Sequence, residues 1–189
     1  AQFGGDWETM VLNCLDIADT VTLAKYTTFG EGRWGALERK PLVVFTGTTD
    51  AVLANAIAVS DTRKTDRING QLVAPGSKNL PFVVAARQLA RIARLANEDP
   101  ASDYGSLDAS GLTPGASNVQ WNYQVRDAAL KAGSSTSKIK DGVINIGDVI
   151  TFFHPDGDEY PAYRHVVDIV KLQTIIYNIA LIFDTPEWD

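Results

Sequence analysis

The sequence PLVVFTGTTD, residues 41–50, is the clearest indication of fold class in this chain. Residues 42–46 are an unbroken run of apolar and β-branched side chains, which is typical of a strand covered on both faces. Gly47 ends the run, and Asp50 is in a position to cap a helix that begins directly afterwards. One buried strand followed by a helix is the basic unit of an α/β fold.

The segments before and after this unit repeat the pattern. Residues 8–15 (ETMVLNCL) predict a strand, after which Asp19 can cap a short helix. On that helix four side chains are expected to face a core: Val21, Leu23, Ala24 and Tyr26. Asn69-Gly70 predicts a turn, and residues 71–74 predict a third strand. We therefore expect an α/β fold with a layered, mostly parallel sheet, flanking helices and right-handed crossovers.

Residues 81–97 (PFVVAARQLARIARLAN) predict a helix with proline at its first position, where the missing N–H costs nothing. Helical periodicity places four apolar side chains on one face: Ala85, Leu89, Ile92 and Ala96. The opposite face carries Arg87, Arg91 and Arg94. Three interpretations of these arginines remain open: a solvated helix face, a contact with a carboxylate-bearing partner, or a nucleic-acid site. No aromatic side chains interleave with them for base stacking, which argues against the last.

The composition changes after residue 98. Residues 98–118 are rich in Asp, Ser, Gly and Pro and predict a long loop, which usually carries function or marks a boundary. We therefore divide the chain into an α/β domain (1–98), a connector (99–118) and a smaller C-terminal α+β domain (119–189).

Two helices and two strands are expected in this last part. Residues 123–132 predict a helix ended by Gly133, and residues 136–139 and 143–153 predict two strands paired around an Asp-Gly turn. Residues 163–183 predict a long helix that is apolar on nearly all sides. A helix of this kind is normally buried on both sides, so in a chain this short we infer that its partner is missing.

Composition excludes several classes of protein. The 189 residues include 17 Lys and Arg against 23 Asp and Glu, a net charge of −6 that argues against a general nucleic-acid binder. Hydrophobic residues make up 45%, which excludes general disorder. A single cysteine, Cys14, excludes an internal disulfide framework and a multi-thiolate metal site. The first residues contain neither Met nor a signal-like segment, and we expect the chain to be a fragment.

Two short motifs match catalytic or nucleotide-binding patterns without their usual context. Residues 30–35 (GEGRWG) match G-x-G-x-x-G, but they follow a helical segment and leave no room for a phosphate-binding helix before Pro41. Residues 135–138 (STSK) match S-x-x-K, but they follow a helix end and run into a strand, where the two side chains would diverge. The first match is therefore not assigned to a nucleotide site, and we interpret the second as a polar turn.

The remaining metal-binding or reactive residues also have ordinary interpretations. One group of candidate ligands lies close together in sequence: His154, Asp156, Asp158 and Glu159. We interpret it as a solvated surface turn, because it lacks a second histidine and the oxygen spacing of a calcium loop. His165 is expected to be a packed or interfacial residue of the long helix, and Cys14 a small hydrophobe inside a strand. No cofactor, metal or catalytic residue is expected.

The N-terminal segment 7–35 (WETMVLNCLDIADTVTLAKYTTFGEGRWG) resembles contractile tail sheath proteins of Mu-like bacteriophages. In that family a strand-like run is followed by Asp, a Leu-bearing helix and Arg-Trp-Gly. The resemblance therefore implies that the glycine motif of residues 30–35 is part of a loop in a structural protein. The helix from Pro81 and the segment 112–115 (LTPG) fit the same pattern.

The resemblance is strongest over residues 123–183, where short motifs recur in order. They are 127–130 (DAAL), 132–133 (AG), 141–143 (DGV), 148–151 (DVIT), 163–164 (YR) and 166–173 (VVDIVKLQ). The likeness covers nearly the whole chain and corresponds to the middle and the beginning of the C-terminal portion of such a protein.

The resemblance implies a non-enzymatic assembly protein of the phage virion, assembled in the host cytoplasm. Its subunits would form hexameric rings stacked around a tail tube, with baseplate and tail terminator proteins as further partners, and contraction would drive the tube through the host envelope. Extended arms would add strands to neighbouring subunits. Neither nucleic acid nor membrane is an expected partner, and the 189 residues alone are expected to be monomeric at micromolar concentration. The candidate partner-interface residues are Arg87, Arg91, Arg94, Arg164 and Lys171.

Two alternatives remain open. A small flavodoxin-like α/β enzyme or ligand-binding module would place its site beyond the carboxyl ends of the strands, near Asp16, residues 46–50 and residues 74–78. A nucleic-acid-binding adaptor would be retained on DNA in a salt-dependent manner.

Overall fold

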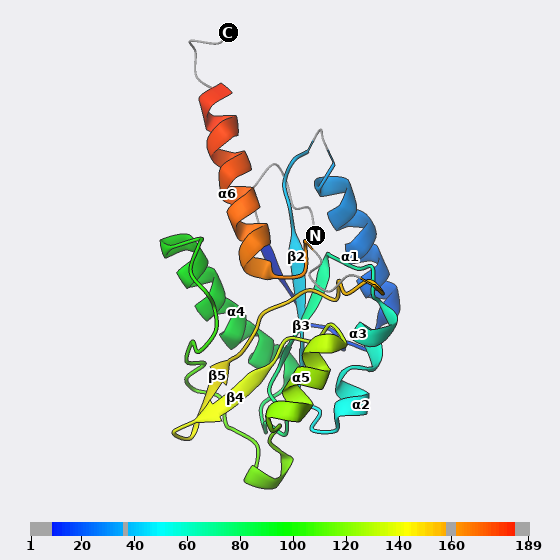
Figure 1. The fold of residues 1–189 in the computed structure, drawn as a ribbon, viewed down its shortest axis with the longest axis vertical. Helices are drawn as coiled ribbons and strands as arrows, with labels where there is room; N and C mark the ends of the chain where they lie inside the picture. The colour runs from blue at the N-terminus through cyan, green and yellow to red at the C-terminus, as the bar shows by residue number, and fades with distance from the viewer. Residues whose placement is uncertain (1–8, 36–37, 158–161, 184–189) are drawn as a thin grey trace.

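The structure is a computed structural model that describes residues 9–35, 38–157 and 162–183. Its elements follow one another along the chain as shown in Figure 1. They are β1 (Met10–Asn13), α1 (Thr20–Arg33), β2 (Val43–Thr48), α2 (Leu53–Ala56), α3 (Ala58–Thr62), β3 (Asn69–Val73), α4 (Pro81–Glu98), a 3₁₀ turn (Ser117–Val119), α5 (Tyr123–Lys131), β4 (Ser137–Lys140), β5 (Val143–Ile146) and α6 (Val166–Phe183).

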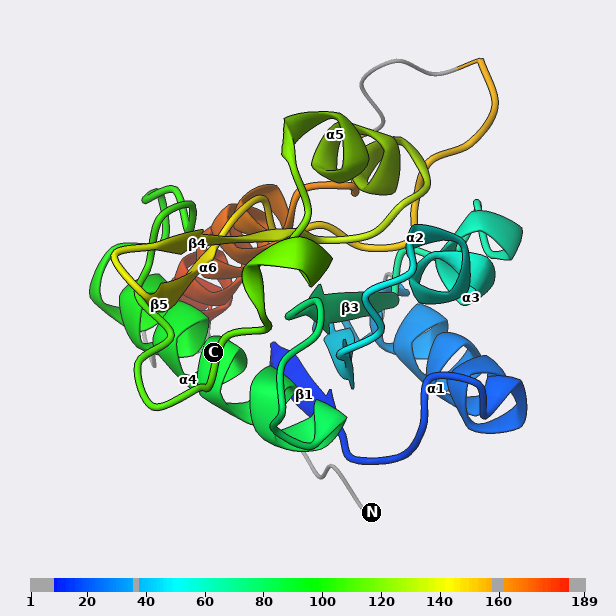
Figure 2. The ribbon, with the colours of Figure 1, turned by 90° about the horizontal axis from the view of Figure 1, so that it is seen from below.

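A three-stranded parallel sheet lies at the centre, in the order β1-β2-β3. Every residue of β2 is buried, which confirms the strand expected from the apolar run. Alternate side chains of β2 point to opposite faces: Val43 and Phe45 belong to one hydrophobic cluster, and Val44 to another. Helix α4 packs on the sheet, and α1 lies on the other side of it in Figure 2. The predicted α/β class, with its layered parallel sheet and flanking helices, is confirmed.

The main hydrophobic cluster extends across the boundaries that we drew at residues 98 and 118. It joins Phe45 of β2 and Val84 of α4 to Ile146 of β5 and Ile169 of α6. Tyr104 and Leu112 of the connector belong to the same cluster. The two parts of the chain therefore share apolar core, and the division into two domains stays a prediction.

Several local predictions are confirmed. The Asp19 carboxylate accepts hydrogen bonds from the backbone N–H of Thr22 (3.1 Å) and from its hydroxyl (2.7 Å), so Asp19 caps α1. Helix α4 has the predicted proline start and extends one residue beyond Asn97. Gly133 follows α5 with a φ of 74°, as a helix-ending glycine should. The β4–β5 hairpin turns through Asp141 and Gly142, both with positive φ.

Other local predictions are wrong. Asn69 and Gly70 belong to β3 rather than to a turn; a side chain on Gly70 would press against Phe45 and the carbonyl of Ile150, so the glycine serves close packing. Asp50 does not cap a helix. Its carboxylate accepts from the N–H of Val52 (2.8 Å), and α2 begins after Val52 without a side-chain cap.

Three element boundaries also differ from expectation. The first helix is not short, since it runs on to Arg33; the strand expected to reach residue 153 ends at Ile146; and the last helix begins at Val166.

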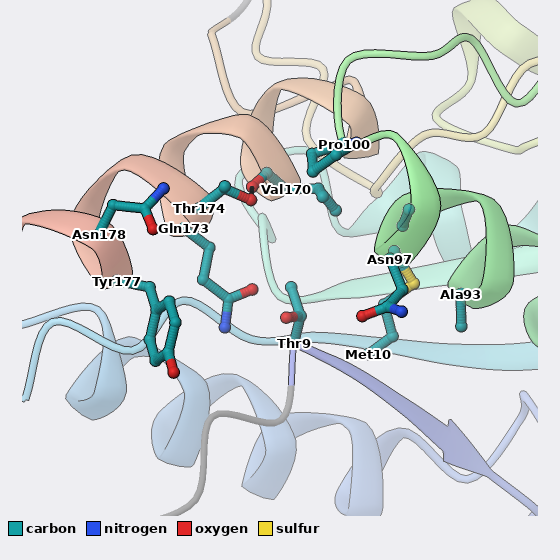
Figure 3. A pocket seen from close by; sticks show the side chains of 11 residues that line it. Thr9, Met10, Ala93, Asn97, Pro100, Val170, Gln173, Thr174, Tyr177 and Asn178 are labelled. Carbon is teal, nitrogen blue, oxygen red and sulfur yellow. Dashed lines mark hydrogen bonds between the residues drawn. The ribbon is translucent and has the colours of Figure 1, made fainter. Parts of the chain in front are cut away.

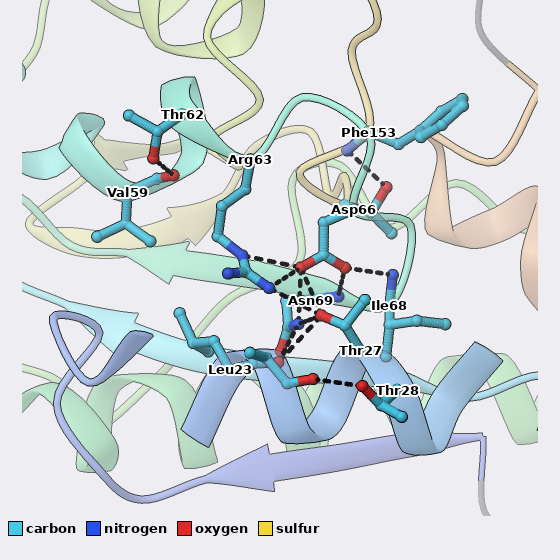
Figure 4. A network of polar contacts seen from close by, with 12 residues as sticks. Leu23, Thr27, Thr28, Val59, Thr62, Arg63, Asp66, Ile68, Asn69 and Phe153 are labelled. Carbon is cyan, nitrogen blue, oxygen red and sulfur yellow. Dashed lines mark hydrogen bonds and ion pairs between the residues drawn. The ribbon is translucent and has the colours of Figure 1, made fainter. Parts of the chain in front are cut away.

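A buried carboxylate connects α1 to β3 and to the turn before it (Figure 4). Asp66 forms an ion pair with Arg63 (2.7 Å) and accepts a hydrogen bond from the hydroxyl of Thr27 on α1 (2.9 Å). The same carboxylate accepts from the backbone N–H groups of Ile68 and Asn69 (3.0 Å each) and from the Asn69 amide (2.8 Å). Because its negative charge is compensated by so many donors, burial is tolerated here.

Replacing Tyr104 by Phe is expected to reduce the loss of stability at alkaline pH. Burial, with a smaller contribution from the charge of Asp99, raises the pKa of Tyr104 to about 12, whereas an unfolded tyrosine titrates near 10. A pKa that is raised on folding stabilises the fold below pH 10, and this contribution is lost as the pH rises towards 12. Urea titrations at about pH 9 and about pH 11 give the unfolding free energy that each protein loses between these pH values. This loss should be roughly 1 kcal/mol smaller for Tyr104→Phe than for the parent chain.

The control is Tyr123→Phe, whose ring is exposed. It should follow the parent chain at both pH values, and an equal response of the two variants would contradict the assignment. The Tyr104 hydroxyl has no hydrogen-bond partner among the residues that the structure describes, so its removal at neutral pH should cost little.

Candidate functional site

The connector covers the segment that follows the carboxyl end of β3, which is part of the edge where a flavodoxin-like module would bind its ligand. The Asn79 amide oxygen accepts from the N–H of Thr113 (2.6 Å), and the Ser77 hydroxyl donates to the Thr113 carbonyl (2.7 Å). Gly115 lies so close to Pro75 and Gly76 that any side chain on it would collide with their backbone.

Trp121 closes the same end. Its indole N–H donates to the carbonyl of Ala51 (2.9 Å), and its ring packs in a small cluster with Val73 and Ala129. The segments after β2 and β3 are therefore packed against other parts of the chain, whereas Asp16 after β1 is exposed. The packing at β2 and β3 argues against the flavodoxin-like alternative.

The G-x-G-x-x-G match has a packing role. Gly30 and Gly32 lie inside α1 rather than in a loop, and Gly30 is buried against Ile68 without room for a side chain. No strand-to-helix turn exists at these glycines, so they cannot hold a pyrophosphate in the usual way.

The S-x-x-K match is also structural, although it is not the polar turn that we expected. Ser135 is buried, and its hydroxyl bonds to the N–H (3.0 Å) and carbonyl (3.1 Å) of Ile150. Lys138 instead donates to the hydroxyl of Ser106 (2.9 Å). The serine is therefore committed to the fold and is not paired with the lysine.

The sequence around His154 departs from the predicted solvated turn. The His154 ring is nearly buried, and its Nδ1 lies 2.6 Å from the carbonyl of Phe152. Asp156 is exposed and pairs with Lys64 (2.6 Å), and this hydrogen bond lowers the pKa of Asp156. Asp158 and Glu159 lie outside the described residues. Over 9–35, 38–157 and 162–183, no group of three His, Cys, Asp or Glu side chains is placed to hold a metal ion.

Two further side chains are more exposed than predicted. Cys14 lies just beyond β1 and is exposed, so it is not a small hydrophobe within the strand. His165 is exposed and precedes α6, where its carbonyl accepts from the N–H groups of Asp168 and Ile169. It is therefore not packed within the helix.

The candidate interface residues have intramolecular contacts. The Arg87 and Arg91 guanidinium groups donate to the carbonyls of Ser110 (3.3 Å) and Asp108 (3.0 Å), which fastens the connector to α4. Arg94 pairs with Glu98 (2.9 Å), and Lys171 with Asp168 (3.4 Å). Arg164 is half-buried and donates to the carbonyl of Leu130 (2.6 Å), and this burial lowers its pKa. The arginines of α4 lie together, whereas Arg164 and Lys171 lie at the start of α6.

Helix α6 has two unlike ends. Its first turns are built into the core through Val166, Ile169 and Val170. Its second half rises away from the sheet in Figure 1. This half also exposes large apolar side chains to solvent. These are Ile175, Tyr177, Ile179, Leu181, Ile182 and Phe183. The structure thus confirms an apolar helix and shows that its first half is covered by the core of this chain.

A hollow of about 600 Å³ lies between α6, the end of α4 and the start of β1 (Figure 3). Uncharged polar side chains line much of it, among them Asn97, Thr174 and Asn178. Because Met10 is the first residue of β1 and Thr9 precedes it, this hollow opens at the amino end of β1, opposite the edge where α/β enzymes bind their ligands.

The α1 face is a surface that the sequence pattern did not predict. Of the four side chains expected to face a core, only Leu23 is fully buried, while Val21 is 65% exposed and Ala24 is exposed. The α1 hollow, as we call it, is a shallow depression of about 750 Å³ lined by Thr20, Val21, Ala24, Lys25, Thr28 and Phe29. Neither the spacing of the apolar residues in α1 nor its composition distinguishes this exposed face from the face that packs on the sheet.

The chain was compared with known proteins. No protein-family profile and no curated protein matches it. Among solved structures, the crystal structure of the sheath tail protein from Desulfitobacterium hafniense superposes with a TM-score of 0.64 at 16% sequence identity. The match covers 94% of this chain and 39% of that one, so the chain spans well under half the length of its structural neighbour. At this identity the comparison shows that the chain has a tail-sheath-like fold.

Proposed function

We propose that residues 1–189 form the middle and the beginning of the C-terminal portion of a bacteriophage contractile tail sheath subunit. Such subunits would stack as hexameric rings around the tail tube, and contraction of the stack would drive the tube through the host envelope. The observation that carries this proposal is the fold likeness to a sheath tail protein over 94% of the chain. The Mu-like character rests on the sequence resemblance alone.

The internal architecture supports a structural rather than a catalytic role. The segment after the carboxyl end of β3 is closed by the connector, and the side chains of Ser135 and Asp66 form their hydrogen bonds within the fold. A subunit of a contracting sheath has to move as a rigid body. A hydrophobic cluster that unites sheet, connector and α6 supplies that rigidity.

The proposed partners are other sheath subunits, the tube protein, and the baseplate and tail terminator proteins. We place the protein in the virion tail, with assembly in the host cytoplasm. Arg87, Arg91 and Arg94 retain exposed N–H donors for a carboxylate-bearing neighbour, and Arg164 and Lys171 could orient a second contact. Contacts of this kind direct orientation more than they add affinity.

Reversing the charge of Arg94 is expected to impair sheath assembly by the full-length protein. Arg94→Glu would place an acid one turn from Glu98 and would repel a carboxylate-bearing neighbour. Lys131→Glu is a matched control, because Lys131 is equally exposed and also has an acid one turn away, Asp127. We expect few or no pelleted sheaths from the first variant and normal yield from the second. Equal yields of pelleted sheaths from the two variants would show that Arg94 does not contribute to the interface.

Immunogold labelling of phage particles tests the proposal itself. Antibodies raised against residues 1–189 should decorate the tail shaft between head and baseplate along its whole length. Label confined to the head or baseplate, or found only on soluble protein, would reject the sheath assignment.

A further inference from the structure

From Leu172 onward, α6 carries an apolar stripe on the side away from the core. The α6 stripe consists of Leu172, Ile175, Ile179 and Ile182, which are 36%, 57%, 47% and 56% exposed. Their spacing of three, four and three residues is that of a helix that packs along its length against another helix. The buried residues Val166, Ile169, Val170 and Gln173 lie on the opposite side of α6. An outward face of a surface helix is normally polar, so this stripe indicates a contact.

The α1 hollow has the dimensions that the stripe requires. Residues 172–183 span about 18 Å of helix, and residues 20–29 of α1 span about 15 Å. Small side chains at Ala24 and Thr28 make the α1 hollow shallow, while Val21 and Phe29 border it. No charged residue occurs between Leu172 and Phe183, and the only charge in the α1 hollow belongs to Lys25, whose long stem can turn aside.

Helices α6 and α1 lie apart on different sides of the central sheet in both views, so the two surfaces belong to separate parts of the molecule (Figures 1 and 2). We propose that the α6 stripe of one copy docks in the α1 hollow of a second copy. This contact is heterologous, because it joins two different surfaces. Every pair still has one unoccupied α6 stripe and one unoccupied α1 hollow, so further copies can add at both ends. The inference deepens the sheath proposal and rests on it, because a stacked assembly requires contacts that propagate, whereas two α6 stripes paired with each other would stop at a dimer.

A membrane is the competing occupant, since α6 with a mean hydropathy of 1.7 has the length and composition of a spanning helix. However, residues 174–183, which lie beyond the core-bound turns, extend only about 15 Å, half of the hydrocarbon thickness of a bilayer. They also include Asn178, whose side-chain amide would be costly in lipid. A protein surface fits the stripe better.

The proposed contact is weak on its own. The contact is about 18 Å long and one helix wide. The area that it buries is therefore smaller than the roughly 1,200 Å² of total area that a stable interface buries. We therefore expect residues 1–189 to be monomeric at micromolar concentration and to associate only at high concentration. In a sheath the contact would be repeated around every ring and would gain from that multiplicity.

Sedimentation of mixed variants tests the contact. Reductant is present to prevent disulfide formation between copies, because Cys14 is exposed. As the protein concentration is raised from about 1 μM to about 500 μM, the weight-average mass should rise continuously and pass the mass of a dimer. Ile175→Asp removes the stripe and Ala24→Asp blocks the hollow, and each alone should weaken association about tenfold or more. An equimolar mixture should form a 1:1 dimer and nothing larger, because only one productive pair of surfaces remains.

Tyr123→Asp is the matched control, because it places an acid at an exposed aromatic position of α5 away from both surfaces, and it should associate like the parent chain. Ile179→Asp should reproduce Ile175→Asp and guards against a variant that misfolds. The proposal would be overturned if the parent chain stayed monomeric at all concentrations or if its mass reached a plateau at the dimer. It would also be overturned if Ala24→Asp associated like the parent chain, or if the equimolar mixture formed no dimer. Flotation with phosphatidylcholine vesicles that depends on Ile175 but not on Ala24 would assign the stripe to lipid instead. Full-length variants that still build sheaths would reject this contact and leave the sheath function intact.

Discussion

Gly47→Ala is expected to prevent the chain from folding stably. Gly47 lies in the fully buried strand β2, directly beneath the start of α4, and a methyl group there would overlap the carbonyl group of Pro81. Neither the central strand nor the first turn of α4 can move without breaking the sheet or the main hydrophobic cluster. We expect a loss of more than about 4 kcal/mol of unfolding free energy, seen as insoluble protein or as loss of the cooperative thermal transition.

Gly32→Ala is the matched control. Gly32 lies within α1, and no atom is close enough to obstruct an added methyl group. Alanine is the better helix former by up to about 1 kcal/mol, so this variant should be as stable as the parent chain or more stable. A soluble Gly47→Ala protein with an unchanged melting temperature would show that α4 does not approach β2 as described.

Asp66→Ala is expected to cost about 3–5 kcal/mol of unfolding free energy, the usual consequence of removing one member of a buried, hydrogen-bonded ion pair. The change would leave the Arg63 guanidinium and the N–H groups of Ile68 and Asn69 without their acceptor. Because Thr27 binds the same carboxylate, α1 should also loosen from the sheet. Urea unfolding measures the cost, and hydrogen exchange in α1 measures the loosening.

Asp156→Ala provides the comparison, because Asp156 also pairs with a basic residue, Lys64, but on the surface. Exposed ion pairs contribute little, so its unfolding midpoint should match that of the parent chain. Equal midpoints for the two variants would mean that the Asp66 network does not stabilise the fold.

The parts of the fold that could be predicted from the sequence are those set by local chemistry. The apolar run of β2, the proline start of α4, the Asp19 cap and the Asp-Gly hairpin each depend on a few adjacent residues. Gly47, Gly30 and Gly70 could not be interpreted in this way. Their roles depend on which distant backbone or side chain comes to lie against them, and the turn predicted at Asn69-Gly70 was wrong for that reason.

The candidate surfaces were predictable only in part. The excess apolar character of α6 was visible in the sequence, whereas the division into a core-bound half and an exposed half depends on where the sheet ends. Val21 and Ala24 were assigned to the core, because an apolar side chain on a short helix gives no indication of which side faces the sheet. The arginines of α4 were recognised as a group, but their bonds to the connector carbonyls follow from tertiary structure.

Electron microscopy of the purified full-length protein tests the central claim most directly, because the proposed function requires its copies to assemble with one another. We expect hollow, striated cylinders whose rings have sixfold symmetry in end-on views. A homogeneous population of dispersed particles at the highest soluble concentration, with no cylinders under any salt condition, would contradict the account.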